Sequence, residues 1–177
     1  TWGTQVSTPV VNEKYAKVVL NTKLATLKGA DRRAYRIVTE IKDPNGKVVA
    51  KQENKLSIYN ECQFEQEFAV ATPALWSVEN PFLYTAESKI YAGNTLKDEY
   101  TTRFGIRTLE IIPEKGFFLN GKLTKFQGVC NHHDLGPLGA AVNDAAIRRQ
   151  IRIMKDMGVN AIRTSHNMPA PELVAAR

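Results

Sequence analysis

Hydrophobic and polar residues alternate along most of residues 1–108, and this period of two is typical of β-strands with one buried face. The run CQFEQEFAV, for example, places Phe64, Phe68 and Val70 on one face. The stretch DPNGK supplies the proline and the Asn-Gly pair that favour a tight turn between two runs. The predicted strands lie at residues 17–27, 34–41, 48–54, 62–70, 81–93 and 98–111. Six or seven short strands within about 100 residues predict an immunoglobulin-like β-sandwich.

The pattern changes after residue 108. The run FFLNGKLTKFQGVC predicts a hairpin that turns at Asn120-Gly121 and has a buried strand as its second arm. Residues 143–158 follow the helical period instead. Asn143 or Asp144 can cap the start of this helix, and Gly158 suits the left-handed position after its end. Its apolar face consists of Ile147, Ile151, Met154 and Met157.

A further strand is predicted at residues 159–165, and residues 169–177 begin a second helix. A strand, a helix and a strand in close succession form a βαβ unit, so the two strands should be parallel. A parallel sheet needs cover on both faces or closure into a barrel. Since a TIM barrel takes roughly 250 residues, residues 109–177 predict the first βα units of a truncated (β/α)8 barrel. The predicted domains are therefore 1–108 and 109–177.

Composition adds little to this interpretation. The net charge is +6, but the lysines and arginines are spread along the chain, which favours a solvated surface over a nucleic-acid site. No apolar run approaches the roughly 20 residues of a membrane helix, so no membrane partner is expected. Cys62 and Cys130 fall in different predicted domains and lack CxxC spacing, so we expect two free, buried thiols.

All three histidines lie in the short α/β segment. His132 and His133 follow the first predicted parallel strand, whereas Arg163 and His166 lie at the end of the second. The carboxyl ends of parallel strands share one edge, and α/β sheets build their sites at that edge. Taken singly, each side chain could be a satisfied structural group. Together they predict a polar ligand site.

Two ligand classes are compatible with this cluster. His132, His133, Asp134 and His166 have the donor atoms of a metal site. Adjacent histidines on a strand point in opposite directions, however, which disfavours a shared ion. Hydrogen bonding of imidazole and guanidinium groups to a polyol is the alternative. The residues alone leave the ligand open, and they show neither a nucleophile elbow nor a phosphate loop.

The motifs GFFLNGKLTKFQGVCNHHDLGPLG and GVNAIRTSHN, separated by the predicted helix, resemble the start of the catalytic barrel in glycoside hydrolase family 2. The segments LWSVENPFLYTAESKIYAG and RFGIRTLEI are similar to the last strands of that family's immunoglobulin-like domain, and WGTQVSTP resembles the linker into it. The variant HHDLGPLG resembles β-galactosidase-type members. The resemblance implies an internal fragment of a retaining β-glycosidase that acts on a carbohydrate and requires no cofactor.

The resemblance also implies roles by position. His132 matches the family histidine that contacts the sugar after the first barrel strand. Arg163 and His166 match the family's R-x-S-H motif, in which the arginine positions catalytic carboxylates and the histidine contacts substrate hydroxyls. Asp134 matches a substrate-binding position in a loop that varies among subfamilies. Asn131 stands where many members carry Arg or Lys, which leaves the identity of the sugar open, as does the role of His133.

Retaining glycosidases need two carboxyl groups about 5–5.5 Å apart. The family's glutamates lie on later barrel strands, the acid/base in an Asn-Glu pair. The pairs Asn12-Glu13 and Asn60-Glu61 fall in the predicted sandwich and are not candidates. We therefore expect no catalytic residue in this chain and no activity from it alone.

Two other functions stay open at this stage. The chain could be a non-enzymatic β-sandwich that binds carbohydrate or another protein, or part of a metal-dependent hydrolase. The resemblance suggests a periplasmic or extracellular enzyme, although the sequence shows no signal peptide. Because a truncated barrel leaves an unpaired sheet edge and a bare apolar face, we also expect the chain to self-associate.

Overall fold

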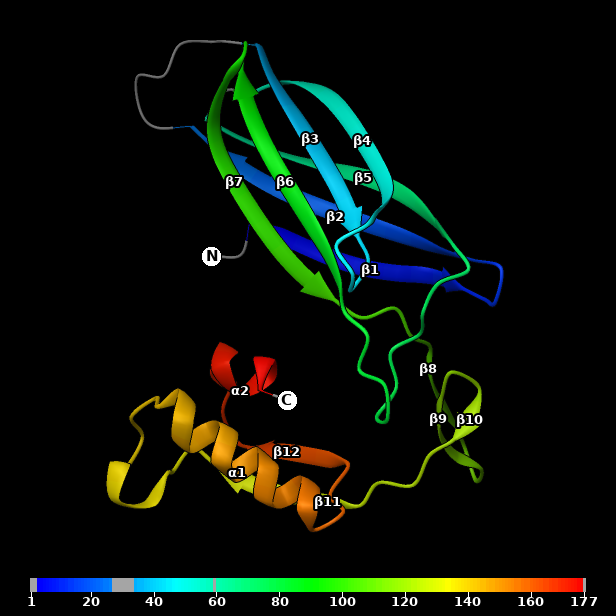
Figure 1. Cartoon of the computed structure of the whole chain (residues 1–177), viewed down its shortest axis with the longest axis vertical. Helices are drawn as coiled ribbons and strands as arrows, with labels where there is room; N and C mark the ends of the chain where they lie inside the picture. Colours follow the sequence, from blue (N-terminus) through cyan, green and yellow to red (C-terminus); the bar gives the residue numbers. More distant parts are fainter. Residues whose placement is uncertain (1–2, 27–33, 59, 177) are drawn as a thin grey trace. The chain divides into compact units, whose positions relative to one another are not determined.

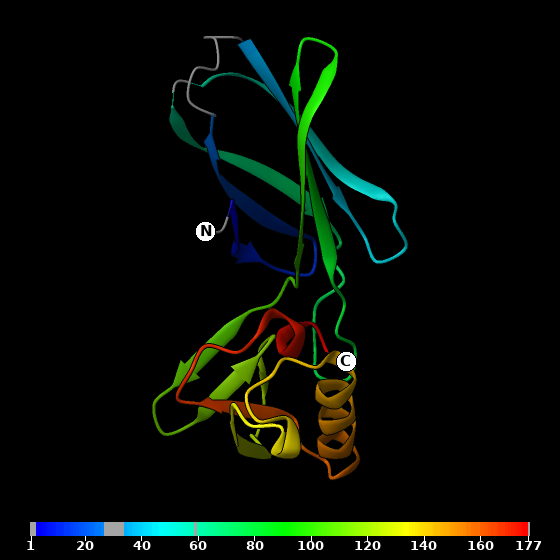
Figure 2. The ribbon, with the colours of Figure 1, turned by 90° about the vertical axis from the view of Figure 1, so that its left-hand side faces the viewer.

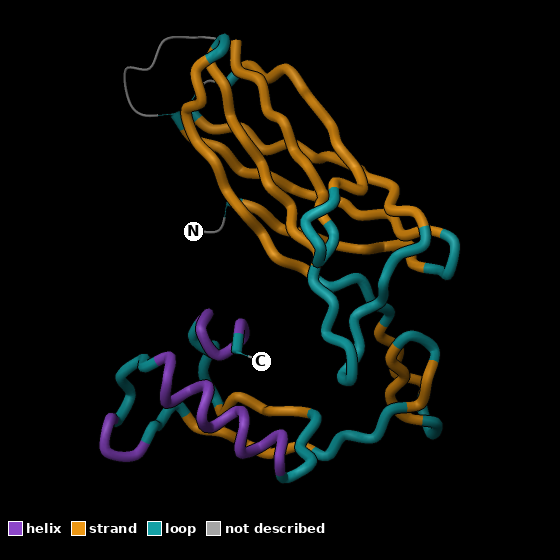
Figure 3. The backbone as a smooth tube through the Cα atoms, viewed as in Figure 1, coloured by secondary structure: helices purple, strands orange, loops and turns teal. Residues whose placement is uncertain are grey.

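A computed structural model describes residues 3–26, 34–58 and 60–176, and Figure 3 shows its helices, strands and loops. The chain divides into two compact units. The first contains the residues up to Ile112 together with Phe118–Lys122, and the second contains Pro113–Phe117 and the residues from Leu123 onward.

The first unit is the predicted β-sandwich (Figure 1). One sheet has the strand order β1-β2-β5 and the other has the order β4-β3-β6-β7. All strand pairs of the two sheets whose register is defined are antiparallel. The strands are β1 (Thr4–Val11), β2 (Tyr15–Ala25), β3 (Ala34–Lys42), β4 (Val48–Ser57), β5 (Glu61–Ala71), β6 (Tyr84–Ala92) and β7 (Thr95–Phe104).

The alternation seen in the sequence accounts for the core of the sandwich. In β2, every second residue from Ala16 to Thr22 is buried. The same period places Phe68 and Val70 of β5 in the core, whereas Phe64 remains outside the fully buried set. The core also encloses polar side chains. Gln66 is 1% exposed, and its Oε1 accepts a hydrogen bond from the Thr39 hydroxyl, with 2.8 Å between Oε1 and the Thr39 Oγ1.

Two sequence predictions about the sandwich were wrong in detail. The segment at residues 2–9 resembled a linker, but most of it belongs to the edge strand β1. This strand tolerates Pro9 because its pairing register with β2 shifts between Ser7 and Val10. The run at 98–111 is two strands, β7 and a separate β8 (Leu109–Ile112). Residue 27, at the end of the first predicted strand, lies outside the described residues.

The predicted hairpin around Asn120-Gly121 forms only in part. Asn120 and Gly121 adopt positive φ angles of 52° and 74°, as such a turn requires. The strands β8, β9 (Gly116–Leu119) and β10 (Lys122–Leu123) form a small sheet in the order β10-β9-β8. The second arm was predicted as one strand to residue 130, which is wrong, because β10 ends after two residues.

The second unit contains a βαβ motif. Strands β11 (Gly128–His132) and β12 (Ala161–Ser165) pair in parallel, as predicted, with helix α1 (Asp144–Asp156) between them in the chain. The Asn143 side chain accepts a hydrogen bond from the Ala146 amide at 3.0 Å and caps the helix. A short turn of 3-10 helix, Gly136–Leu138, precedes α1, and α2 (Pro171–Ala175) follows β12.

The helix buries less of its predicted apolar face than expected. Ile147 and Ile151 are buried, whereas Met157 follows the end of the helix and is 71% exposed. Gly158 adopts the predicted left-handed conformation, with φ of 84°. In the view of Figure 2, α1 stands beside the strand pair and covers one side of it.

Candidate functional site

The β11-β12 pair has two different faces. The parallel register sets Val129 beside Ile162 and Asn131 beside Thr164, and these four residues are half-buried. Helix α1 covers this face, because the amides of Asn131 and Gln150 exchange two hydrogen bonds with donor–acceptor distances of 3.2 and 3.3 Å.

The opposite face, which we call the open face, carries Cys130, His132, Arg163 and Ser165. The first three of these residues are exposed. The prediction that Cys130 is buried was therefore wrong; both cysteines are free, and Cys62 is half-buried. In a closed barrel of parallel strands, the face opposite the helices points into the barrel.

Arg163 is held at the open face by two neighbours. Its Nη1 donates a hydrogen bond to the Ser165 hydroxyl, 2.8 Å away, and lies 4.0 Å from the sulfur of Cys130. Ser165 is only 3% exposed, so its hydroxyl is sheltered from solvent. The guanidinium is thereby oriented by one contact from its own strand and one from β11.

The two predicted site histidines meet at the carboxyl edge of the strand pair. His132 is the last residue of β11, and His166 directly follows β12 after a cis peptide bond. Their rings lie edge to face with centroids 5.6 Å apart. Because Arg163 lies on the same strand pair, the structure gathers three of the four predicted site residues on two neighbouring strand ends.

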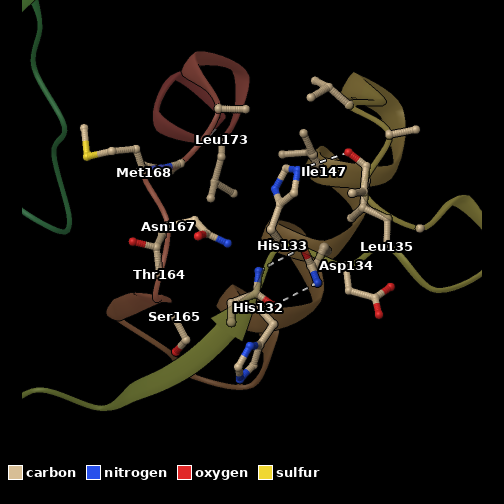
Figure 4. A pocket seen from close by; sticks show the side chains of 18 residues that line it. His132, His133, Asp134, Leu135, Ile147, Thr164, Ser165, Asn167, Met168 and Leu173 are labelled. Atoms are coloured by element: carbon tan, nitrogen blue, oxygen red, sulfur yellow. Dashed lines mark hydrogen bonds between the residues drawn. The ribbon is translucent and has the colours of Figure 1, made fainter.

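Asp134, the fourth predicted site residue, is bound within the loop after β11. Its carboxylate accepts a hydrogen bond from the Gly136 amide at 2.7 Å. The His133 ring nitrogen Nε2 lies 3.0 Å from the Ala140 carbonyl oxygen, so this imidazole also shapes the loop. Figure 4 shows the rings of His132 and His133 pointing in opposite directions from the strand end.

A pocket opens at the carboxyl edge, between the loop after β11 and the start of α2 (Figure 4). Its empty space is about 500 Å³, including the solvent at its mouth. His132, Asp134 and Ser165 contribute to its lining, whereas Arg163 and His166 do not. Its apolar lining residues include Leu135, Ile147, Met168 and Leu173.

The chemistry of the cluster suits a ligand with hydroxyl or carboxylate groups. Imidazoles donate or accept hydrogen bonds, and a guanidinium presents planar donors that match a carboxylate. Within residues 3–26, 34–58 and 60–176, no three His, Cys, Asp or Glu side chains are close enough to hold a metal ion. None of the described helices is long and apolar enough to cross a membrane.

Sequence reasoning missed the residues that support the cluster. Ser165 enters the sequence prediction only as part of the R-x-S-H motif, although its spacing of two from Arg163 places both side chains on one face of a strand. The Asn131–Gln150 amide pair joins β11 to α1 across 19 positions, and no local pattern indicates it. Cys130 was considered only for a disulfide or a metal site.

Two family profiles together match nearly the whole chain. The profile for glycosyl hydrolases family 2 matches residues 3–107. The profile for the TIM barrel domain of glycosyl hydrolases family 2 matches residues 111–175. The two matches follow one another in the order of the sandwich and the βαβ motif.

Named relatives and solved structures agree with these profiles. The chain is 43% identical over 175 residues to the beta-galactosidase BoGH2A of Bacteroides ovatus, covering 98% of this chain and 20% of that protein. It is 39% identical over 166 residues to a putative beta-glucuronidase of Formosa agariphila, covering 94% and 15%. A crystal structure of a glycosyl hydrolase family 2 member from Bacteroides cellulosilyticus superimposes with a TM-score of 0.93 at 36% identity, covering 99% and 23%. The chain thus spans about a fifth of the length of these relatives.

Proposed function

Because this chain belongs to glycosyl hydrolase family 2, we propose that it is part of a β-glycosidase that hydrolyses O-glycosidic bonds. The chain supplies the immunoglobulin-like sandwich and the first strands of the catalytic barrel. The observation that carries the proposal is the gathering of Arg163, His132 and His166 at one strand edge, with Arg163 already oriented by Ser165. This edge is where barrel enzymes bind their substrates.

In this proposal, the two imidazoles hydrogen-bond to sugar hydroxyls. The 5.6 Å separation of their ring centroids lets them address neighbouring hydroxyls of one ring. Arg163 lies deeper on the open face, where its remaining donors can orient a carboxylate. Asp134 lines the pocket and contacts the sugar from the loop.

The bond-breaking steps need groups beyond this set. Retaining glycosidases use one carboxyl group as general acid and base and another as nucleophile, about 5–5.5 Å apart. Imidazole and guanidinium groups that bind and orient the sugar do not replace a nucleophilic carboxylate. We therefore propose that the 177-residue chain alone is inactive, and that the catalytic carboxylates come from other strands of the barrel.

We propose a β-galactoside as the substrate, because the relative with 43% identity is named a beta-galactosidase. A β-glucuronide is the second candidate, since a relative with 39% identity is named a putative beta-glucuronidase. Asn131 bears on this choice. Its side chain is an uncharged amide that is hydrogen-bonded to Gln150, so this position offers the sugar no cation.

The test uses a full-length family 2 enzyme that carries this chain, assayed with aryl β-galactoside and aryl β-glucuronide. His166→Ala should lower kcat/KM by about 10²–10³, as expected for loss of a hydrogen bond that strengthens in the transition state. Arg152→Ala is the control, because Arg152 is an exposed residue of α1 that does not line the pocket. Normal kinetics for His166→Ala, with a melting point lowered by several degrees, would show that His166 is a structural histidine.

A further inference from the structure

Arg163 and Ser165 form a contact that the sequence motif alone does not explain. Their side chains leave β12 on the same face, two positions apart. The Arg163 Nη1 to Ser165 Oγ distance is 2.8 Å. Ser165 is one of the few buried polar residues among those the structure describes, at 3% exposure. A buried hydroxyl must find a partner, and here Arg163 provides it.

The surroundings of the guanidinium show what this bond does. Arg163 is exposed, and an exposed arginine samples many rotamers. A guanidinium is planar, so fixing one of its nitrogens fixes the direction of its other donors. The sulfur of Cys130, 4.0 Å from the same Nη1, limits movement on the other side. The remaining N–H groups have no hydrogen-bond partner within the described chain and are free for a ligand.

We propose that Ser165 is a positioning residue, which orients the Arg163 guanidinium for an anionic carboxylate at the open face before the sugar binds. The proposal rests on the role of Arg163 given under the proposed function. Ser165 also lines the pocket, but the role proposed for it requires no contact with the substrate. Its effect on the reaction passes through Arg163, because an oriented donor loses less entropy when the transition state forms.

The first experiment tests the contact between Arg163 and Ser165 and needs no activity assay. Nitrogen-15 NMR of the 177-residue chain should show slow hydrogen exchange and hindered rotation at the Arg163 guanidinium. Ser165→Ala should abolish both, whereas Ser165→Thr should keep them because it retains the hydroxyl. Ser88→Ala is the matched control: Ser88 is 4% exposed, and its hydroxyl oxygen lies 3.0 Å from that of Thr39 in the sandwich. An Arg163 signal unchanged by Ser165→Ala would overturn the proposal.

The second experiment tests the consequence in a full-length enzyme that carries this chain. Ser165→Ala should lower kcat/KM by about tenfold or more through kcat, the size expected for removal of one hydrogen bond to a charged group. Ser165→Thr should restore most of it, and Ser88→Ala should leave kinetics unchanged.

A double-mutant cycle separates the role of Ser165 from that of Arg163. If Ser165 acts through Arg163, then Ser165→Ala should have no further effect on kcat/KM in the Arg163→Ala background. Additive losses would show that Ser165 acts independently and would overturn the positioning role. Normal kinetics for Arg163→Ala would instead overturn the proposed function of Arg163, while leaving the NMR result on the contact intact.

Discussion

Replacing Arg163 by lysine tests whether the site needs an oriented guanidinium or only a positive charge. Arg163 uses Nη1 for Ser165 at 2.8 Å, which leaves its other nitrogens for a carboxylate. A lysine ammonium carries its three N–H donors on one atom at the end of a flexible stem. It can meet the serine hydroxyl or the ligand, but it cannot present a planar fork to both.

The expected magnitude follows from the hydrogen bond that a lysine cannot make. One hydrogen bond to a charged group contributes about 1.5–3 kcal/mol, and each 1.36 kcal/mol corresponds to a factor of ten in rate. Arg163→Lys should therefore lower kcat/KM by about 10–100-fold in a full-length enzyme that carries this chain. The lysine ammonium can still donate to the buried Ser165 hydroxyl, so the free energy of unfolding of the 177-residue chain should change by less than about 1 kcal/mol.

The assay is steady-state hydrolysis of an aryl β-glycoside, with Arg152→Lys as the matched control. Arg152 is an exposed arginine on α1, so its replacement should not change kinetics. If Arg163→Lys retains kcat/KM within about threefold, charge alone is sufficient. The inferred need for guanidinium geometry would then be wrong.

Further predictions concern the chain itself. Gly105→Ala should lower the free energy of unfolding of the chain by about 1–3 kcal/mol, because a Cβ there would lie 2.9 Å from the Cβ of Trp76. Urea titration measures this change, and unchanged stability would contradict the packing. Thr22→Val should raise stability by about 1 kcal/mol, since the Thr22 hydroxyl is buried and has no hydrogen-bond partner in the described part of the chain; a decrease would reveal a hidden partner. In dilute solution a thiol reagent should modify Cys130 before Cys62, because burial raises the pKa of the Cys62 thiol and lowers its thiolate fraction. Mass spectrometry after short labelling gives the order of modification. Light scattering should detect dimers or larger species at high concentration, with Cys130 protected as they form; a monodisperse monomer would contradict the expected association through the truncated barrel.

The sandwich was predictable from the sequence because each of its strands has one buried face. In β2 and β5, the hydrophobic residues that recur at every second position in the sequence correspond to alternating buried residues in the structure. Strand β1 was harder to predict, since Pro9 is typical of a loop. Only its place at the edge of a sheet, with a register shift beside the proline, makes a strand possible there.

The location of the site was also predictable in part. Parallel strands end at a common edge, so His132 and His166 had to come near one another once the βαβ unit was recognised. The connection into β11 was not predictable. Asn160 holds it in place: its Oδ1 accepts from the Gln127 amide at 2.8 Å, and its Nδ2 donates to the Lys125 carbonyl at 2.9 Å. These hydrogen bonds join positions more than 30 residues apart, and no local pattern indicates them.

A crystal structure of a full-length enzyme that carries this chain, with a β-glycoside analogue trapped in its site, would test the proposed substrate contacts of His132, Arg163 and His166. We expect His132 and His166 to lie within hydrogen-bond distance of the sugar hydroxyls. We also expect Arg163, still bonded to Ser165, to face a carboxylate at the open face. A sugar bound on the β-sandwich, or one that contacts neither histidine, would contradict the proposed contacts.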